Sequence, residues 1–245
     1  MPRSICHPLI NNYVNNMDKL FSHISVGPFE LDHRVVLAPL TRMRTERGNV
    51  AGDLMVDYYT QRASSGGLLI SDATAVSPLG IAYVDAPGIY TEEQVKGWKR
   101  VTDAVHAKGA RIFLQMWHAG RQAHPANTGG LTPVAPSALR SLEHAVIRDG
   151  YGNIVEAELV VPRVLEIEEI AVIVAQFRRG AELAKQAGFD GGNCTVRTDT
   201  CSSSSCWTAR TSVRTNMAAR LKFARAFCST RSMPSCPCGG RVVWR

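Results

Sequence analysis

Three short apolar runs, each followed by a segment with helical spacing, constrain the fold of this chain more than any other feature. The runs are residues 35–38, 68–71 and 112–116. Strands that are apolar at successive positions bury both faces, and this is typical of parallel strands covered by helices. We therefore expect a strand–helix–strand–helix–strand–helix order with these runs as the strands.

Helices are expected where apolar residues recur every three or four positions. Thr91 and Gln94 have the spacing of a capping box, which marks the start of a helix. Gly109 and Gly188 follow periodic segments and are expected to end them. A long loop rich in Gly, Pro and Asn is expected to run from the third strand to Pro162. The expected helices lie over residues 54–62, 91–108 and 170–184.

An alternating strand and helix order allows two α/β architectures. A doubly wound sheet and a (β/α)8 barrel both consist of parallel strands with crossover helices. No G-x-G-x-x-G motif follows the first strand, so nothing favours a dinucleotide-binding fold. The residue pattern alone leaves the choice open.

Composition changes sharply after Gly191. Residues 192–245 contain nine Lys or Arg and one acidic residue, whereas residues 1–191 contain 19 basic and 20 acidic residues, within a chain of net charge +7. The basic character therefore belongs to a tail, and we expect no nucleic-acid binding by the body of the chain. Six of the seven cysteines also lie in the tail. Their irregular spacing lacks paired C-x2–4-C knuckles, so we expect no metal site.

The chain divides into three parts by pattern. Residues 1–17 are a polar lead-in, residues 18–191 carry the strand and helix pattern, and residues 192–245 are the basic tail. No run of about 18 apolar residues occurs, so no membrane span is expected. The first residues also lack the apolar core of a secretory signal, and we expect a cytoplasmic protein.

Several motifs occur in one register within residues 18–191. Together they resemble the old yellow enzyme family, and the Trp-His-x-Gly-Arg and Pro-Gly-Ile-Tyr stretches are most similar to its 12-oxophytodienoate reductase branch. The motifs are HRVVLAPLTRMR from His33, YY and QR from Tyr58, GGLLIS from Gly66, PGIY from Pro87, AVHAKG from Ala104, QMWHAGR from Gln115, PR and LE from Pro162, and AGFDG from Ala187.

The resemblance implies an FMN-containing (β/α)8 barrel. In this family NADPH reduces the flavin, which passes a hydride to the β-carbon of an α,β-unsaturated carbonyl compound. A tyrosine protonates the α-carbon, and a His/Asn or His/His pair holds the carbonyl oxygen, where negative charge develops. The chain is therefore expected to be a reductase of small enones of the oxylipin type. The implied cofactor-binding residues are Pro39, Leu40, Thr41, Ala73 and Gln115.

Three of these residues have distinct implied roles. Thr41 resembles the hydroxyl that hydrogen-bonds a flavin carbonyl, Ala73 the small residue beside the ring edge, and Gln115 the amide that bonds the pyrimidine. Each alone is more often a cap or a satisfied core residue, and their joint occurrence in one register favours the flavin role. His118 is expected to be structural, and Trp117 either lines the substrate pocket or packs in the core.

The resemblance stops after Gly191. The family continues as VELHGANGYLL, which supplies the carbonyl-binding His and Asn and the proton-donating Tyr, whereas this chain reads GNCTVRTDTCSSSSCW. We therefore expect no catalytic residues. Deleting one base from the valine codon of a sequence encoding the family stretch reproduces residues 190–208. Our hypothesis is a single-base frameshift, with residues 192–245 out of frame and disordered; the alternative is a genuine basic Cys/Ser-rich module.

This departure has physical consequences for the chain. Three strands cannot close an eight-stranded barrel, and the first and third strands are expected to be edges. We therefore predict that the chain binds FMN weakly or not at all and reduces no enone. The alternative to a reductase is thus an inactive truncated relic.

Overall fold

The computed structural model describes residues 18–196 and 241–243. Its helices are α2 (Asp53–Arg62), η1 (Pro78–Gly80), α3 (Glu92–His106), η2 (Gly120–Gln122) and α4 (Ile167–Gln186). Its strands are β1 (Ile24–Val26), β2 (Phe29–Leu31), β3 (Val36–Leu37), β4 (Leu68–Ala75), β5 (Arg111–His118), β6 (Val134–Ala135), β7 (His144–Arg148), β8 (Ile154–Glu158), β9 (Arg163–Val164), β10 (Gly191–Val196) and β11 (Arg241–Val243).

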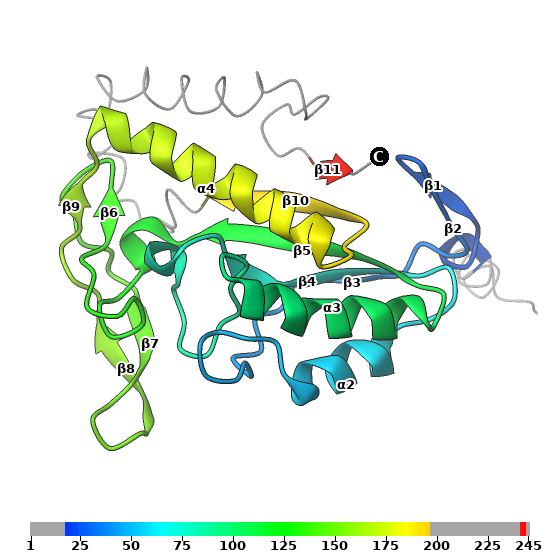
Figure 1. Cartoon of the computed structure of the whole chain (residues 1–245), viewed down its shortest axis with the longest axis horizontal. Helices are drawn as coiled ribbons and strands as arrows, with labels where there is room; N and C mark the ends of the chain where they lie inside the picture. The colour runs from blue at the N-terminus through cyan, green and yellow to red at the C-terminus, as the bar shows by residue number, and fades with distance from the viewer. Residues whose placement is uncertain (1–17, 197–240, 244–245) are drawn as a thin grey trace, which may run out of the picture.

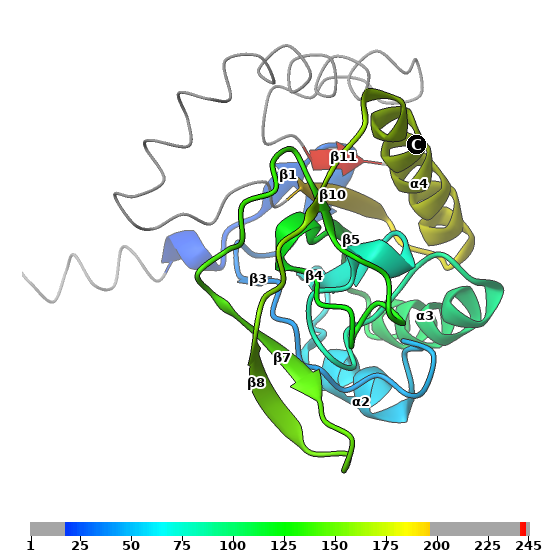
Figure 2. The same cartoon turned by 90° about the vertical axis from the view of Figure 1, so that its left-hand side faces the viewer.

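The main sheet has the order β11-β10-β5-β4-β3. Neighbouring strands from β3 to β10 are parallel, and β11 alone is antiparallel to its neighbour. Figure 2 shows α2, α3 and α4 along one side of this sheet, as connections between parallel strands require. The predicted order of strands and helices and their parallel pairing are confirmed.

The main core lies between the sheet and these helices. Ile112, Leu114 and Met116 of β5 are fully buried there together with Trp98 of α3 and Phe177 of α4. Burying a side chain of this size contributes about 1.5–3 kcal/mol. Because strand residues alternate between faces, the odd-numbered residues of β5 point to the other side of the sheet.

The start of α3 has the capping box that the sequence predicts. Gln94 donates its backbone N–H to Thr91 Oγ1 at 3.3 Å, and Gln94 Oε1 accepts from the Thr91 N–H at 3.1 Å. Two N–H groups that the helix itself leaves unpaired are satisfied in this way.

A hairpin that the sequence did not predict lies at the amino-terminal end of the sheet. Strands β1 and β2 form this antiparallel hairpin, at the end of the molecule opposite β7 and β8 (Figure 1). Leu31 packs with Leu68 of β4 and Phe113 of β5 in a small buried cluster. The hairpin therefore covers apolar residues on the sheet face that the helices leave free.

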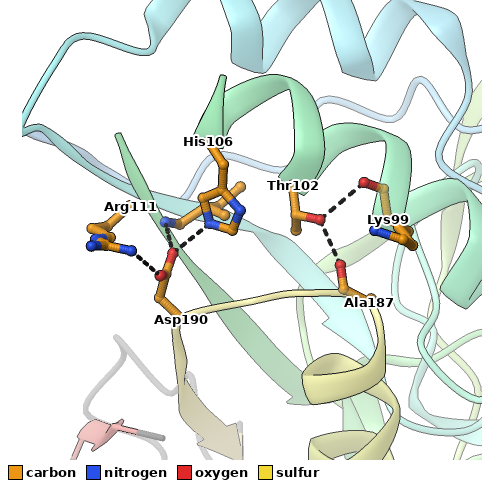
Figure 3. Close-up of polar contacts among 7 residues, drawn as sticks. Lys99, Thr102, His106, Arg111, Ala187 and Asp190 are labelled. Atoms are coloured by element: carbon orange, nitrogen blue, oxygen red, sulfur yellow. Dashed lines mark hydrogen bonds and ion pairs between the residues drawn. The ribbon is translucent and has the colours of Figure 1, made fainter. Parts of the chain in front are cut away.

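Asp190 ties the start of β10 to β5 and α3 (Figure 3). Its carboxylate accepts hydrogen bonds from His106 Nε2 at 2.8 Å, Arg111 Nη1 at 2.9 Å and the Ile112 N–H at 2.9 Å. Only 8% of the Asp190 side chain is exposed. Three hydrogen bonds to a buried carboxylate offset the free-energy cost of removing it from water. Because these bonds come from α3 and β5, they fix the position of β10, which follows Asp190.

Two predictions about the strands are corrected. The run over residues 35–38 was expected to be buried, but β3 covers two residues and Val35 and Val36 are 48% and 40% exposed. The reason is that no other described strand pairs with the outer side of β3. The third strand, β5, was expected to be an edge, but β10 pairs with it over six residues, from Gly191 to Val196.

The expected loop between β5 and Pro162 also contains regular structure. Strands β7 and β8 form an antiparallel hairpin that extends away from the sheet (Figure 1), and β6 pairs with β9. In the tail, residues 192–196 and 241–243 are in strands. Residues 197–240 lie outside the described residues, so the predicted disorder of the tail stays a prediction there. Within the described residues, no helix has the length and hydrophobicity needed to cross a membrane.

Candidate functional site

The residues expected to contact a cofactor lie toward one edge of the sheet. Pro39, Leu40 and Thr41 directly follow β3, Ala73 lies near the end of β4, and Gln115 lies in β5. Parallel strands end at the same edge, and barrel enzymes build their sites at this carboxyl-terminal face. The site therefore has to be assembled from the two strands and the loop that follows β3.

Ala73 and Gln115 meet across the sheet. They are register partners in the β4–β5 ladder, and a bulge between Ile70 and Ala73 sets this register. The Gln115 N–H donates to Ser71 Oγ at 3.0 Å, a hydrogen bond at the bulge. Gln115 points away from the helix-packed core, because Leu114 and Met116 face that core. The structure thus brings together two of the five predicted residues.

Strand β10 adds two polar residues to the same face. Asn193 is the register partner of Gln115, and Thr195 is the partner of Trp117. The Gln115 amide donates from Nε2 to Thr195 Oγ1 at 3.3 Å. Thr195 occupies the fourth position after Gly191, where the family stretch has its carbonyl-binding histidine. The position faces the site, and the residue there is a threonine.

A buried acid connects the loop after β3 to the bulge in β4. Asp72, 1% exposed, precedes Ala73, and its Oδ2 accepts the Arg42 N–H at 2.7 Å. Its Oδ1 accepts a hydrogen bond from the Tyr59 hydroxyl of α2, and that hydroxyl accepts the Asp72 N–H at 2.7 Å. Burial raises the pKa of the Asp72 carboxyl, and the bonds from Tyr59 and Arg42 oppose this rise. Sequence reasoning missed this pair, although an acid within an apolar strand was a visible signal.

The same acid raises the pKa of Tyr59. Burial is the largest cause, and the charge of the neighbouring Asp72 carboxylate adds to it, so the pKa of Tyr59 lies well above its ordinary value. The phenol therefore stays protonated and keeps its proton for the bond to Asp72. Charged acceptors make stronger hydrogen bonds than neutral ones, which makes this contact a firm link between α2 and β4.

The loops at the site contain strained backbone. Met43, Asn49 and Asp85 have backbone φ angles of 51°, 60° and 52°. Residues other than glycine rarely adopt this left-handed region. They lie in the segments that follow β3 and β4. Asp85 also accepts the Thr45 N–H through its carbonyl at 3.2 Å and pairs with Arg148 of β7 at 2.5 Å. Strain of this kind persists where the surroundings fix it, as at binding sites.

Trp117 and His118 lie on opposite faces of β5. Trp117 is 5% exposed and packs with Ala73 and with Tyr83, whose ring centroid is 5.6 Å away. It therefore belongs to a packed cluster beside the predicted site. His118 accepts the Gly120 N–H through Nδ1 at 3.2 Å, and burial lowers its pKa to about 4. A buried neutral ring on the far face fits the structural role expected for His118.

Similarity to known proteins decides the family. The model of the NADH:flavin oxidoreductase / NADH oxidase family matches residues 19–194. The chain belongs to this family. The match ends inside β10, three residues beyond the point where the sequence motifs end.

Individual members of the family give the same result. The chain is 41% identical over 179 residues to the flavin oxidoreductase hxnT of Emericella nidulans, covering 71% of this chain and 45% of the relative. It is 44% identical over 172 residues to 12-oxophytodienoate reductase 1 of Oryza sativa subsp. japonica, covering 70% and 43%. The chain thus spans about half the length of the curated relatives it matches.

Solved structures of the family confirm the fold. The old yellow enzyme homologue of Zymomonas mobilis superimposes with a TM-score of 0.67 at 39% identity, over 72% of this chain and 48% of that protein. Morphinone reductase superimposes with a TM-score of 0.69 at 38% identity, over 85% and 59%. The predicted fold class, part of a (β/α)8 barrel, is confirmed.

The family's cofactor is FMN, and the residues at the site fit its ring. The Gln115 amide offers both a donor and an acceptor, and Ala73 beside it is a small residue that packs with Trp117. Trp117 Nε1 is buried without a hydrogen-bond partner among the described residues. Trp117 lies on the same face as Gln115, and an unpaired buried polar atom at a site indicates a missing polar partner. Barrels usually bind phosphate groups after their seventh and eighth strands, so the described residues fit the ring alone.

Proposed function

We propose that residues 18–191 are the flavin-contacting half of an ene-reductase that uses FMN and NADPH to reduce the C=C bond of α,β-unsaturated carbonyl compounds of the oxylipin type. The observation that carries the proposal is the register pairing of Ala73 with Gln115 at the edge where Thr41 follows β3. The similarity to 12-oxophytodienoate reductase 1 supports the substrate class.

Each of the five predicted residues would have a role in holding the flavin ring. The Gln115 amide would hold the pyrimidine edge of the flavin, and the Thr41 hydroxyl would donate to a ring carbonyl, which would raise the electron affinity of the flavin. Ala73 would lie beside the ring edge, and Pro39 and Leu40 would contact the ring. FMN bound there would supply the hydride transfer from NADPH to the substrate.

The reduction step itself needs groups that this chain does not offer. Stabilising the developing oxyanion takes donors aimed at the carbonyl oxygen, and Thr195 stands where the family has its histidine. The positions of the family's Asn and Tyr lie beyond residue 196, outside the described residues. This favours the second candidate function, an inactive relic, for the chain as printed. We expect it to bind FMN weakly or not at all and to reduce no enone.

The reading frame provides the test. The gene and its transcript are sequenced across the codons for Asp190 to Asn193, and two proteins are produced, one as printed and one from a coding sequence with the missing base restored. We expect the restored protein to be yellow and to oxidise NADPH in the presence of 2-cyclohexenone, and the printed chain to do neither. Stoichiometric flavin in the printed chain would contradict the expected loss of FMN binding.

Variants of the restored protein test the individual residues. Gln115→Leu and Thr41→Val remove the polar groups at nearly constant size, and each should weaken FMN binding about 10-fold, the effect of losing one hydrogen bond. Ser25→Ala, at an exposed position of the β1–β2 hairpin at the opposite end of the sheet, is the control. Unchanged FMN affinity in both site variants would refute the assignment. NADH is compared with NADPH, because morphinone reductase has been solved in complex with tetrahydroNAD.

A further inference from the structure

Asp72 is the one acid buried within the central strands β4 and β5. It is 1% exposed and lies at the bulge that offsets β4 before Ala73. An ionised carboxylate in such a place needs hydrogen bonds to compensate for lost water. Its bonds go to two other elements, α2 and the loop after β3.

The two carboxylate oxygens of Asp72 accept hydrogen bonds from different elements. Oδ1 accepts from the Tyr59 hydroxyl, which in turn accepts the Asp72 N–H, so the acid is fixed relative to α2 from two sides. Oδ2 is then left to accept the Arg42 N–H at 2.7 Å. Arg42 is 30 positions away in the sequence and follows Thr41 directly. The position of the Thr41 backbone is thus tied to the bulge that carries Ala73.

Over residues 39–44, the bond from the Arg42 N–H to Asp72 is the one backbone hydrogen bond to another element that the structure describes, whereas Thr45 and Asn49 further along the loop bond to the carbonyl groups of Asp85 and Ala86. Leu40 and Arg42 are exposed, and Met43 has a φ angle of 51°. A loop with exposed side chains and strained backbone keeps one conformation only where specific bonds hold it. The bond from the Arg42 N–H to Asp72 is such a bond.

We propose that Asp72 is a positioning residue that holds the loop carrying Thr41 at a fixed distance from Ala73 and Gln115, and that Tyr59 holds Asp72 in place for this task. The inference rests on the proposed flavin site for its purpose, but the bond itself does not depend on a ligand. Asp72 touches no ring atom in this role; it acts through the backbone at Arg42.

Hydrogen exchange of the full chain tests the proposal without a cofactor. Asp72→Ala removes the acceptor of the Arg42 amide, and we expect that amide to exchange about 10- to 100-fold faster, as the loss of a bond to a charged group implies. Asp72→Asn should restore much of the protection, because the amide oxygen can still accept from the Arg42 N–H. An acid that only stabilised the fold as a whole would not give a loss of protection confined to the Arg42 amide, nor its recovery in Asp72→Asn.

Asp190→Ala is the matched control. Asp190 is another buried acid that accepts a backbone N–H, but it lies at the opposite end of the sheet. It should speed exchange around Ile112 and leave Arg42 no more affected than the rest of the chain. Equal acceleration of the Arg42 amide in the two alanine variants would overturn the proposal. If Asp72→Ala does not fold, Tyr59→Phe is used, and unchanged exchange at Arg42 would likewise overturn it.

FMN titration separates this inference from the proposed function. If Asp72→Ala speeds hydrogen exchange of the Arg42 amide but the protein with the restored reading frame binds no FMN, the positioning role of Asp72 is kept and the flavin site is refuted. In the restored protein, Asp72→Ala should weaken FMN binding at least as much as Thr41→Val. FMN binding that is unchanged by Asp72→Ala, while Thr41→Val weakens it, would refute the role of Asp72 in placing Thr41.

Discussion

Tyr59→Phe removes one oxygen atom from the buried contact between α2 and β4. The hydroxyl lies in a side chain that is 1% exposed, and it makes two hydrogen bonds with Asp72. Phenylalanine keeps the ring and its packing against Trp98, whose centroid is 6.0 Å away. The substitution therefore tests the polar contact with little change in apolar packing.

The expected loss of stability follows from the groups left behind. The Asp72 N–H and Oδ1 both lose their partner in a site that water does not reach, and each unsatisfied buried group costs about 1–3 kcal/mol. Removing the hydroxyl from the core offsets part of this, by about 0.5–2 kcal/mol. We expect Tyr59→Phe to lower the free energy of unfolding by about 2–4 kcal/mol at neutral pH, a large part of a normal margin of about 5–15 kcal/mol.

The loss should depend on pH through Asp72. Burial already raises the pKa of this carboxyl above its ordinary value of 3.8 in the folded protein, and removing the Tyr59 donor raises it further. The folded state then binds a proton more strongly than the unfolded state, so stability falls as pH rises through the folded pKa. The destabilisation by Tyr59→Phe should therefore be smaller near pH 4 than at neutral pH.

Urea unfolding followed by tryptophan fluorescence measures the effect. Tyr58→Phe is the control, because Tyr58 keeps its ring contacts with Arg62 and has no hydroxyl hydrogen bond among those the structure describes. It should change the free energy of unfolding by less than about 0.5 kcal/mol. A loss below about 1 kcal/mol in Tyr59→Phe, or one that grows as pH falls, would show that Asp72 does not depend on this hydroxyl.

Three further substitutions have effects that the same unfolding assay can measure. Asp190→Asn weakens the bonds from Arg111 and the β5 backbone, and it should cost about 1–3 kcal/mol; a neutral result would mean that these bonds are replaced by water. His118→Gln removes a group whose pKa falls from 6.5 to about 4 on folding. The folded state binds this proton more weakly than the unfolded state, so titration of His118 should lower the free energy of unfolding by about 2 kcal/mol as the pH falls from 7 to 5. The variant should not show this part of the loss of stability in acid. Gly97→Ala places a Cβ atom 2.6 Å from the Ala51 carbonyl oxygen, so it should lower stability by about 1–3 kcal/mol although alanine favours helices; a more stable variant would contradict the close packing of α3 on the segment before α2.

The sequence predicted most of the framework because local patterns determine it. The three apolar runs, the helical spacing between them and the capping box at Thr91 each depend on residues close together in the chain. Gly191 marked the point where the family pattern ends. The hairpin of β7 and β8 was not predicted, because its strands have mostly exposed side chains and lack clear apolar alternation.

Both the family resemblance and the structure were needed to place the site residues. The resemblance supplied Thr41, Ala73 and Gln115, and the structure showed that Ala73 and Gln115 are register partners. The register depends on a β-bulge, which no pattern in the sequence marked. The flavin contacts themselves stay a prediction that the binding experiments above will test.

What the sequence by itself determined was the type of each element, the family and the residue at which the family pattern ends. Only the tertiary structure decided which strands are edges and what holds the loops. β5 is internal because the residues after Gly191 pair with it, and Asp72 matters because the fold brings Tyr59 and Arg42 to its two oxygens. The physical reason is that element type follows from neighbours in the chain, whereas strand pairing and buried hydrogen bonds join residues far apart in it.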